Sequence, residues 1–145
     1  MRSTTINTTD TAATRSTRSR ALNIGLWVLQ VLLAALFLWH GQLMAFPPAE
    51  LVAMIDSSIG PNLRVFIGAA EILAAAGLIL PGLTRILPGL TALAAAGLMI
   101  VMSSATVFHF VRGETSSAIS ALVIFALVGV VAYARWKIAP FAPRH

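Results

Sequence analysis

Glu71 is the residue of this sequence best placed to do chemistry, because it is an ionisable carboxyl inside a long apolar block. It lies seven residues after Arg64, roughly 10 Å along a helix. An acidic side chain near the centre of a membrane helix costs at least about 2.5–3.5 kcal/mol. We therefore expect Glu71 to face the interior of the protein, to be protonated, or to have a partner.

Possible partners are polar residues that reach a similar depth in neighbouring helices. His40 and Ser103 come within about one helical turn of Glu71, whereas His109 lies nearer the end of its apolar block. Arg64 is on the same helical face as Glu71 and could either approach it or extend outwards. The pair that we favour is Glu71 with His40.

Three interpretations of this polar cluster stay open. In the first, Glu71 is a structural knot, hydrogen-bonded to serines or to His40, that fixes the register of the helices. In the second, the cluster lines a pocket for a quinone or another small hydrophobic molecule. The third is a proton or ion path, which a single acid without a relay supports weakly. His40 and His109 could in principle ligate haem, but they follow no haem motif.

Several kinds of chemistry are excluded by residue types that the sequence lacks. It has no cysteine, which excludes disulfides, thiolate nucleophiles and CxxC redox centres. No metal-ligand cluster, nucleophile–base pair or phosphate-binding loop is evident, so no metal is expected and an enzymatic activity is left undecided. The basic residues lie in tails and turns, which argues against a nucleic acid partner.

The elements that must position these residues are four long apolar blocks. Of the 145 residues 58% are hydrophobic and only 10% are charged, against about 25% charged in soluble domains. A bilayer core needs about 17–25 apolar residues per helix, and each block is long enough. The sequence therefore predicts an all-α integral membrane protein in contact with the lipid bilayer, an antiparallel bundle of four transmembrane helices. The blocks cover about 22–46, 63–80, 86–110 and 118–136.

The segments outside the blocks divide the chain. Residues 1–21 are rich in Ser, Thr and Arg and are predicted to be a disordered tail, 22–138 the transmembrane domain, and 139–145 a short C-terminal tail. A cleaved signal peptide is the competing interpretation of the N-terminus. The first apolar block exceeds the roughly 7–15 residues of a signal h-region, so an uncleaved helix is favoured.

Prolines predict where the first two helices end. Pro47-Pro48 cannot continue the first helix, and Pro81-Gly82 is expected to stop the second. The segment between Pro47 and Asn62 has an apolar stripe. It is predicted to be either a short helix in the membrane interface or an ordinary loop.

A repeat of small residues predicts close packing of the second and third helices. The segment LAAAGL occurs at 73–78 and again at 93–98. If the hairpin folds about Arg85, Ala75 and Ala95 lie at one depth. Small residues let two backbones approach closely, which favours helix association in lipid. The residues expected at such contacts are Gly68, Ala75, Gly77, Ala95 and Gly97.

The distribution of charge predicts the orientation in the membrane. Four tail arginines, Arg85 and three basic residues near the C-terminus share one side, whereas Arg64 and Arg112 lie on the other among three acids. Basic flanks stay cytoplasmic, so both termini are predicted inside, in a bacterial-type inner membrane. The basic residues of the two tails are Arg2, Arg15, Arg18, Arg20, Arg135, Lys137 and Arg144.

The residues around Glu71 resemble the second-helix signature of the DoxX-like membrane proteins. They read Phe66-Ile67-Gly68-Ala69-Ala70-Glu71, followed by Gly77-Leu78-Ile79-Leu80-Pro81. With Phe37-Leu38-Trp39-His40-Gly41 at the end of the first block, the resemblance covers about residues 22–136. It implies a four-helix membrane bundle, some relatives being linked to membrane oxidoreductase complexes and to quinone-coupled oxidation of sulfur compounds.

The same resemblance assigns roles to single positions. The helix-two glycine and glutamate of the family fall on Gly68 and Glu71, and its first-helix glycine falls on Gly41. Many relatives have a lysine shortly after that glycine, where this chain has Gln42-Leu43-Met44. A lysine–glutamate pair is therefore not available here, and His40 could take its structural place.

The expected function is that of an accessory or small-molecule-binding subunit in the inner membrane, possible partners being other membrane or redox subunits. No cofactor is evident from the residues, and a quinone is the one that the resemblance implies. One alternative is a membrane oxidoreductase subunit that uses a quinone bound near Glu71, His40 and His109. A second alternative is a small proton-coupled carrier.

Overall fold

The computed structural model describes the backbone of residues 8–142 and the side chains of residues 19–142. Within this range the chain is helical and forms no strand. The predictions for residues 1–7 and 143–145, including Arg2 and Arg144, lie outside the described residues. The elements are α1 (Thr8–Ala45), α2 (Ala49–Ile59), α3 (Pro61–Thr84), α4 (Leu90–Val111), α5 (Thr115–Tyr133) and the π-helical turn η1 (Ala134–Ile138).

Four stretches of helix are long and apolar enough to cross a membrane. Large apolar side chains such as Leu73 and Ile100 point outwards from them, as is typical of helices that lipid surrounds. The all-α fold with four membrane-spanning helices is therefore confirmed. The spans are Ser19–Ala45, Pro61–Thr84, Leu90–Val111 and Thr115–Ile138.

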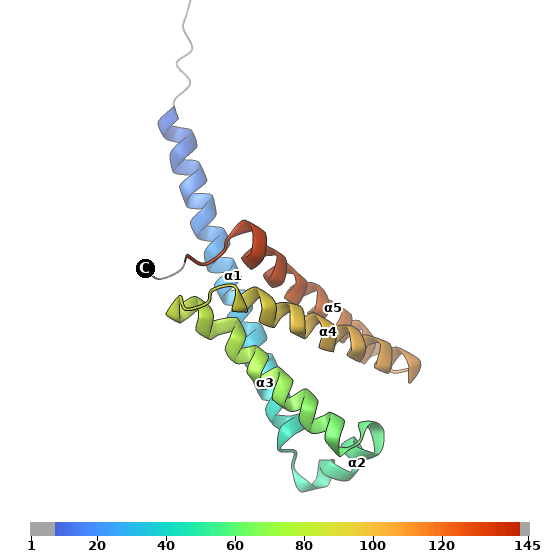
Figure 1. The fold of residues 1–145 in the computed structure, drawn as a ribbon. Helices are drawn as coiled ribbons and strands as arrows, with labels where there is room; N and C mark the ends of the chain where they lie inside the picture. The colour runs from blue at the N-terminus through green and yellow to red at the C-terminus, as the bar shows by residue number, and fades with distance from the viewer. Residues whose placement is uncertain (1–7, 143–145) are drawn as a thin grey trace, which may run out of the picture.

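The four spans are arranged as two helix pairs. α1 packs along α3 and α4 along α5, while α3 and α4 join the pairs and α1 has little contact with α5. Figure 1 shows the two pairs together near the α3–α4 turn and diverging towards their other ends. We call the end with the α3–α4 turn and η1 the terminal end, and the end with α2 and the α4–α5 turn the loop end.

Small residues form the seam between α3 and α4. Ala75 and Ala95 are both buried in the apolar core, and a Cβ on Gly77 would lie 2.7 Å from the Cβ of Ala94. Gly97 does not share this packing, contrary to the prediction, because it is exposed and has no neighbour within 4 Å of a Cβ position. It lies two residues after Ala95, about 200° around the helix axis, and so faces away.

The end of α3 differs from the prediction. The helix does not stop at Pro81-Gly82 but continues to Thr84, where Arg85 has φ 59° and donates its N–H to the Pro81 carbonyl at 3.0 Å. A proline in the last turn removes only one backbone hydrogen bond. Pro81 and Gly82 are also buried, and a Cβ on Gly82 would lie 2.6 Å from Cζ of Phe141. Packing against Phe141 thus outweighs the local stop signal.

The start of α1 also differs from the prediction. α1 begins at Thr8, so the helix runs through most of the segment 1–21 that was expected to be a disordered tail. Neither glycine nor proline occurs between Thr8 and Ile24. Nothing in the local sequence therefore interrupts the helix before the apolar block begins.

α2 occupies the segment between the first two spans, for which a helix and a loop were both open. None of its residues is buried. Gly60 ends it at φ 79°, a conformation that glycine adopts without strain, and donates its N–H to the Asp56 carbonyl at 2.9 Å. The location of this helix in a membrane interface stays a prediction.

Candidate ligand-binding site between the helix pairs

Two glycines let α1 and α3 come very close at the loop end. A Cβ on Gly68 would lie 2.6 Å from the backbone nitrogen of Ala45 and 2.7 Å from the carbonyl oxygen of Gly41. Real Cβ atoms do not approach other atoms this closely, so a side chain at either glycine would separate the helices. The close approach brings the neighbouring residues His40 and Glu71 together.

His40 and Glu71 are in direct contact. Nδ1 of His40 lies 2.6 Å from Oε2 of Glu71. The Glu71 side chain is only 1% exposed, whereas that of His40 is 41% exposed. Among the described side chains, Oε1 of Glu71 has no hydrogen-bond partner. The carboxyl group is thus held through one oxygen, and the other is left without a partner.

A pocket of about 310 Å³ lies beside this pair and is lined by all four spans. Its size falls at the lower end of the range of about 300–1,000 Å³ for small-molecule sites. Its wall combines polar groups with apolar ones, which would orient a ligand and hold its apolar part. The polar lining is His40, Glu71, His109, Ser116, Ser117 and Ser120, and the apolar lining is Leu36, Phe37, Met102, Ala105, Ala121 and Ile124.

A second histidine–carboxylate pair lies next to the pocket, at the α4–α5 turn. Nδ1 of His109 lies 2.6 Å from Oε2 of Glu114, and Nε of Arg112 donates to Oε1 of Glu114 at 2.8 Å. The hydrogen bond from Arg112, followed by that from His109, holds the pKa of the Glu114 carboxyl below its ordinary value. A fixed negative charge therefore orients the His109 ring that lines the pocket.

The family of the chain follows from comparison with known proteins. The family model of the DoxX-like family matches residues 28–131. The chain belongs to the DoxX-like family. The match extends over every residue that lines the pocket, from Leu36 to Ile124. Comparison with the curated proteins and with the solved structures gave no match.

Ser103 of this DoxX-like chain lies outside the pocket, contrary to the prediction that it accompanies Glu71. Its hydroxyl donates to the Ile100 carbonyl at 2.9 Å, and the residue is exposed beside a separate shallow depression. Met102 and Ala105 occupy the pocket wall instead. Successive residues point about 100° apart around a helix. The depth of Ser103 was therefore predicted correctly, but the direction of its side chain was not.

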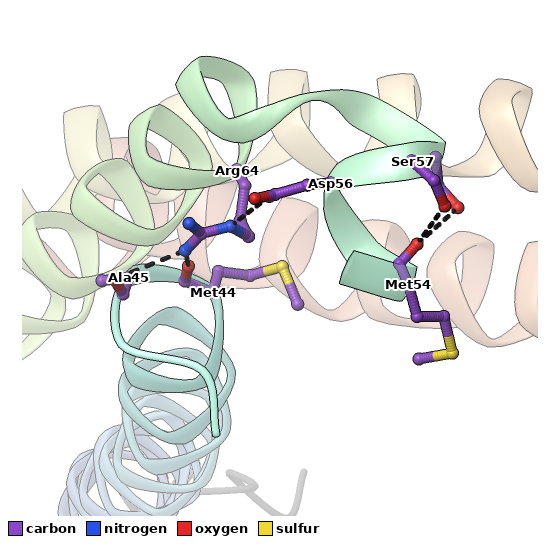
Figure 2. Close-up of polar contacts among 7 residues, drawn as sticks. Met44, Ala45, Met54, Asp56, Ser57 and Arg64 are labelled. Atoms are coloured by element: carbon purple, nitrogen blue, oxygen red, sulfur yellow. Dashed lines mark hydrogen bonds and ion pairs between the residues drawn. The ribbon is translucent and has the colours of Figure 1, made fainter. Parts of the chain in front are cut away.

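Arg64 bonds to groups at the loop end of the bundle and not to Glu71. Its Nε donates to Oδ1 of Asp56 at 2.6 Å, and its Nη1 donates to the Met44 carbonyl at 2.6 Å. Figure 2 shows the guanidinium between α2 and the end of α1, with Ser57 bonded separately to Met54. Arg64 therefore joins three helices and does not line the pocket.

A buried polar cluster at the terminal end centres on Arg135, whose burial was not predicted from the sequence. Nε of Arg135 donates to Oε1 of Gln30 at 2.6 Å, and Nη1 donates to Oδ1 of Asn23 at 2.7 Å. Nε2 of Gln30 in turn donates to the Leu78 carbonyl at 2.6 Å. The signal in the sequence was Gln30, a polar residue inside an apolar block. Arg135 had been interpreted only as a charge that sets orientation, and it lies beyond the DoxX-like match.

Among the described side chains, no three histidines, aspartates or glutamates come together in a way that could hold a metal ion. The two histidines of the pocket instead use Nδ1 to contact carboxylates, His40 with Glu71 and His109 with Glu114. Each ring is thereby fixed in orientation with its Nε2 directed away from that carboxylate. The site of this DoxX-like protein is therefore best described as a membrane pocket with two oriented imidazoles.

Proposed function

We propose that this DoxX-like protein binds a small, partly polar molecule in the pocket and acts as an accessory or small-molecule-binding subunit. The observation that supports this most is the Glu71 carboxyl, which is bound to His40 through one oxygen while the other has no partner among the described side chains. A buried polar atom without a partner costs about 1–3 kcal/mol. A ligand that donates a hydrogen bond to Oε1 would remove this cost.

The lining favours a flat ligand with a hydroxyl or carbonyl group at one end. Phe37, Met102 and Ile124 offer an aromatic, a thioether and a branched aliphatic surface, which suit a ring. Glu71 and His40 can accept and donate hydrogen bonds in the wall of the pocket. Such an arrangement fixes orientation with few polar groups, as small-molecule sites commonly do.

The test is mass spectrometry of small molecules extracted from the protein purified in mild detergent. We expect a bound molecule in the wild type and in Ser103→Ala, because Ser103 lies outside the pocket and bonds only within its own helix. We expect the molecule to be lost in Glu71→Gln, which keeps the size of the side chain. Equal occupancy in wild type and Glu71→Gln, or no molecule in any sample, would contradict the proposal.

A second candidate is a membrane oxidoreductase subunit that uses a bound quinone. A quinone accepts two electrons and two protons when it is reduced, and the contact between His40 and Glu71 provides an imidazole and a carboxyl that can hold a proton beside the pocket. If the Glu71 carboxyl is protonated, its unpartnered Oε1 can donate a hydrogen bond to a quinone oxygen. If the carboxyl is ionised, Oε1 can accept a hydrogen bond from a quinol hydroxyl. The electrons would come from a partner protein.

The quinone candidate has its own test. We expect the extracted molecule to absorb in the ultraviolet as a quinone and to be reduced when borohydride is added. We also expect His40→Gln to retain the quinone more than Glu71→Gln does, because Glu71 is the more deeply buried partner. A bound molecule that is not redox-active would exclude this candidate and leave the binding function in place.

We also propose a bacterial-type inner membrane location with both termini cytoplasmic. The arginines of the loop end are neutralised, Arg64 by Asp56 and Arg112 by Glu114. The terminal end keeps its basic charge, which supports a cytoplasmic position. Reporter domains fused after residue 142 and inserted at Gly113 test this proposal. Cytoplasmic activity is expected only for the first, and the reverse result would contradict it.

A further inference from the structure

Arg135 is a buried cation whose hydrogen bonds all end on neutral groups. It is 4% exposed, and it donates to the side chains of Gln30 and Asn23 and, at 3.1 Å, to the Ala139 carbonyl. Its Nη2 has no partner among the described side chains. Burial of a charge away from water is costly unless an opposite charge accompanies it.

The contrast with Arg64 shows what Arg135 lacks. Arg64 is 8% exposed and donates to the carboxylate of Asp56. Among the described side chains the terminal end offers Arg135 no such carboxylate. The exposed ionised side chains there are basic, and the described carboxylates belong to other parts of the fold. The basic ones are Arg20, Arg85 and Lys137, and the carboxylates are Glu50, Asp56, Glu71 and Glu114.

Aromatic rings shield the guanidinium group. The Phe141 ring centroid lies 3.9 Å from Cζ of Arg135, and the Trp27 centroid lies 5.8 Å from it. Phe141 follows η1 in a non-helical stretch, and its ring is only partly buried, between Trp27 and Gly82. This stretch could therefore move aside without unfolding a membrane span. Movement of Phe141 would uncover the guanidinium group that its ring now lies against.

We propose that Arg135 binds the phosphate group of an anionic lipid at the terminal end, with Phe141 displaced from the guanidinium. The last span ends at Ile138, and Arg135 lies only three residues before that end. This position places the Arg135 side chain close to the depth of the lipid head groups. Nη2 carries two N–H groups without a partner among the described side chains, and a guanidinium N–H donates a charge-assisted hydrogen bond to phosphate. Basic sites between membrane helices bind anionic head groups in this way.

The test compares lipids and variants of the full chain purified in mild detergent. Native mass spectrometry counts bound lipid, and the thermal unfolding midpoint reports stabilisation by phosphatidylglycerol or by zwitterionic phosphatidylcholine. We expect phosphatidylglycerol to bind and to raise the midpoint in wild type and in Arg85→Gln, an exposed arginine at the same end. We expect Arg135→Gln to weaken binding at least tenfold and to abolish the rise.

Two further variants keep the proposal testable if Arg135→Gln does not fold. Arg135→Lys keeps the charge but not the planar group that can donate to Gln30, Asn23 and phosphate at once, and it is expected to bind with intermediate affinity. Phe141→Ala removes the competing ring and is expected to bind more tightly than wild type.

Several outcomes would overturn the proposal. Equal loss in Arg85→Gln and Arg135→Gln would show general attraction to a basic surface. Equal binding of both lipids would show that the negative charge of the lipid is not recognised. Unchanged binding in Arg135→Gln would show that Arg135 does not bind the lipid. If inorganic phosphate raised the midpoint as much as phosphatidylglycerol does, the ligand of Arg135 would be a soluble anion and not a lipid.

Discussion

The carbonyl oxygen of Gly41 lies 2.7 Å from the position that a Cβ on Gly68 would take. This contact between α1 and α3 sets the distance at which His40 meets Glu71. Gly68→Ala would force the two helices apart, and overpacking of this kind typically costs about 1–3 kcal/mol. We expect a free energy of unfolding lower by that amount, measured by titration with a denaturing detergent.

Gly97→Ala is the matched control for this prediction. Gly97 lies in the interior of α4 with no neighbour within 4 Å of a Cβ position. Its replacement should leave the free energy of unfolding unchanged or slightly raised, because alanine favours helix more than glycine does. Equal destabilisation by Gly68→Ala and Gly97→Ala would show that close packing at Gly68 is not what stabilises the pair.

The two partners of the contact between His40 and Glu71 should respond unequally to substitution. His40→Ala leaves the fully buried Glu71 carboxyl without its partner, which should cost about 1–3 kcal/mol. Glu71→Gln should cost less, because it leaves no buried carboxyl group without a partner, and His40 itself is 41% exposed. We expect the double variant to be more stable than His40→Ala alone, since a neutral amide is easier to bury than a carboxylate. Additive losses in detergent titration would contradict this coupling.

Arg64→Met should loosen the loop end of the bundle. The change removes the donor to Asp56 and to the Met44 carbonyl inside a largely buried site, which should cost about 1–3 kcal/mol. Hydrogen exchange should become faster in α2 and in the last turn of α1. Arg112→Met is the control, because its exposed pair with Glu114 is screened by solvent and is expected to contribute little. Similar effects of both substitutions would argue against a special role for Arg64.

Glu114 should make stability depend on acid pH. Its pKa lies below the ordinary value of 4.5 because Arg112 and His109 donate hydrogen bonds to it. The folded protein therefore binds a proton at this site less readily than the unfolded chain, so the stabilisation is present above pH 4.5 and is lost as the pH falls. Between about pH 7 and about pH 3.5 the thermal midpoint of Glu114→Gln should fall less than that of the wild type. Parallel curves would contradict the assignment.

Counting along the helices was enough to predict which residues share a depth. The rise per residue is constant, so the distance of His40 and Glu71 from the same ends of their helices could be read from the sequence. The apolar blocks likewise gave the four spans, because lipid requires long helices whose backbone groups bond internally.

Direction around the helix and contacts with non-periodic segments could not be predicted in this way. Ser103 has the predicted depth but faces away from the pocket, whereas Met102, one residue earlier in the same helix, lines it. The partner of Arg64 is Asp56 on α2, whose position depends on the turns on either side of that helix. These features depend on tertiary packing, which a local pattern does not encode.

The terminal end shows the same limit more clearly. Pro81-Gly82 is a strong local stop signal, yet Phe141, which lies far along the chain beyond the last span, packs on Gly82 and the helix continues. Arg135 had been interpreted as a charge that sets orientation in the membrane, whereas Gln30 and Asn23 accept its hydrogen bonds in the interior. Both outcomes rest on contacts between residues that are distant in sequence.

The seam at Gly77 and Ala94 has a mechanical consequence for the pocket. It acts as a fulcrum near the terminal end, and α4 extends from Ala94 to Val111 as a lever arm of roughly 25 Å. A tilt of about 5° at the fulcrum would displace the far end by about 2 Å. The spacing of the wall at His109 from the wall at Glu71 therefore depends on the packing of two small residues that lie nearer the terminal end and do not line the pocket.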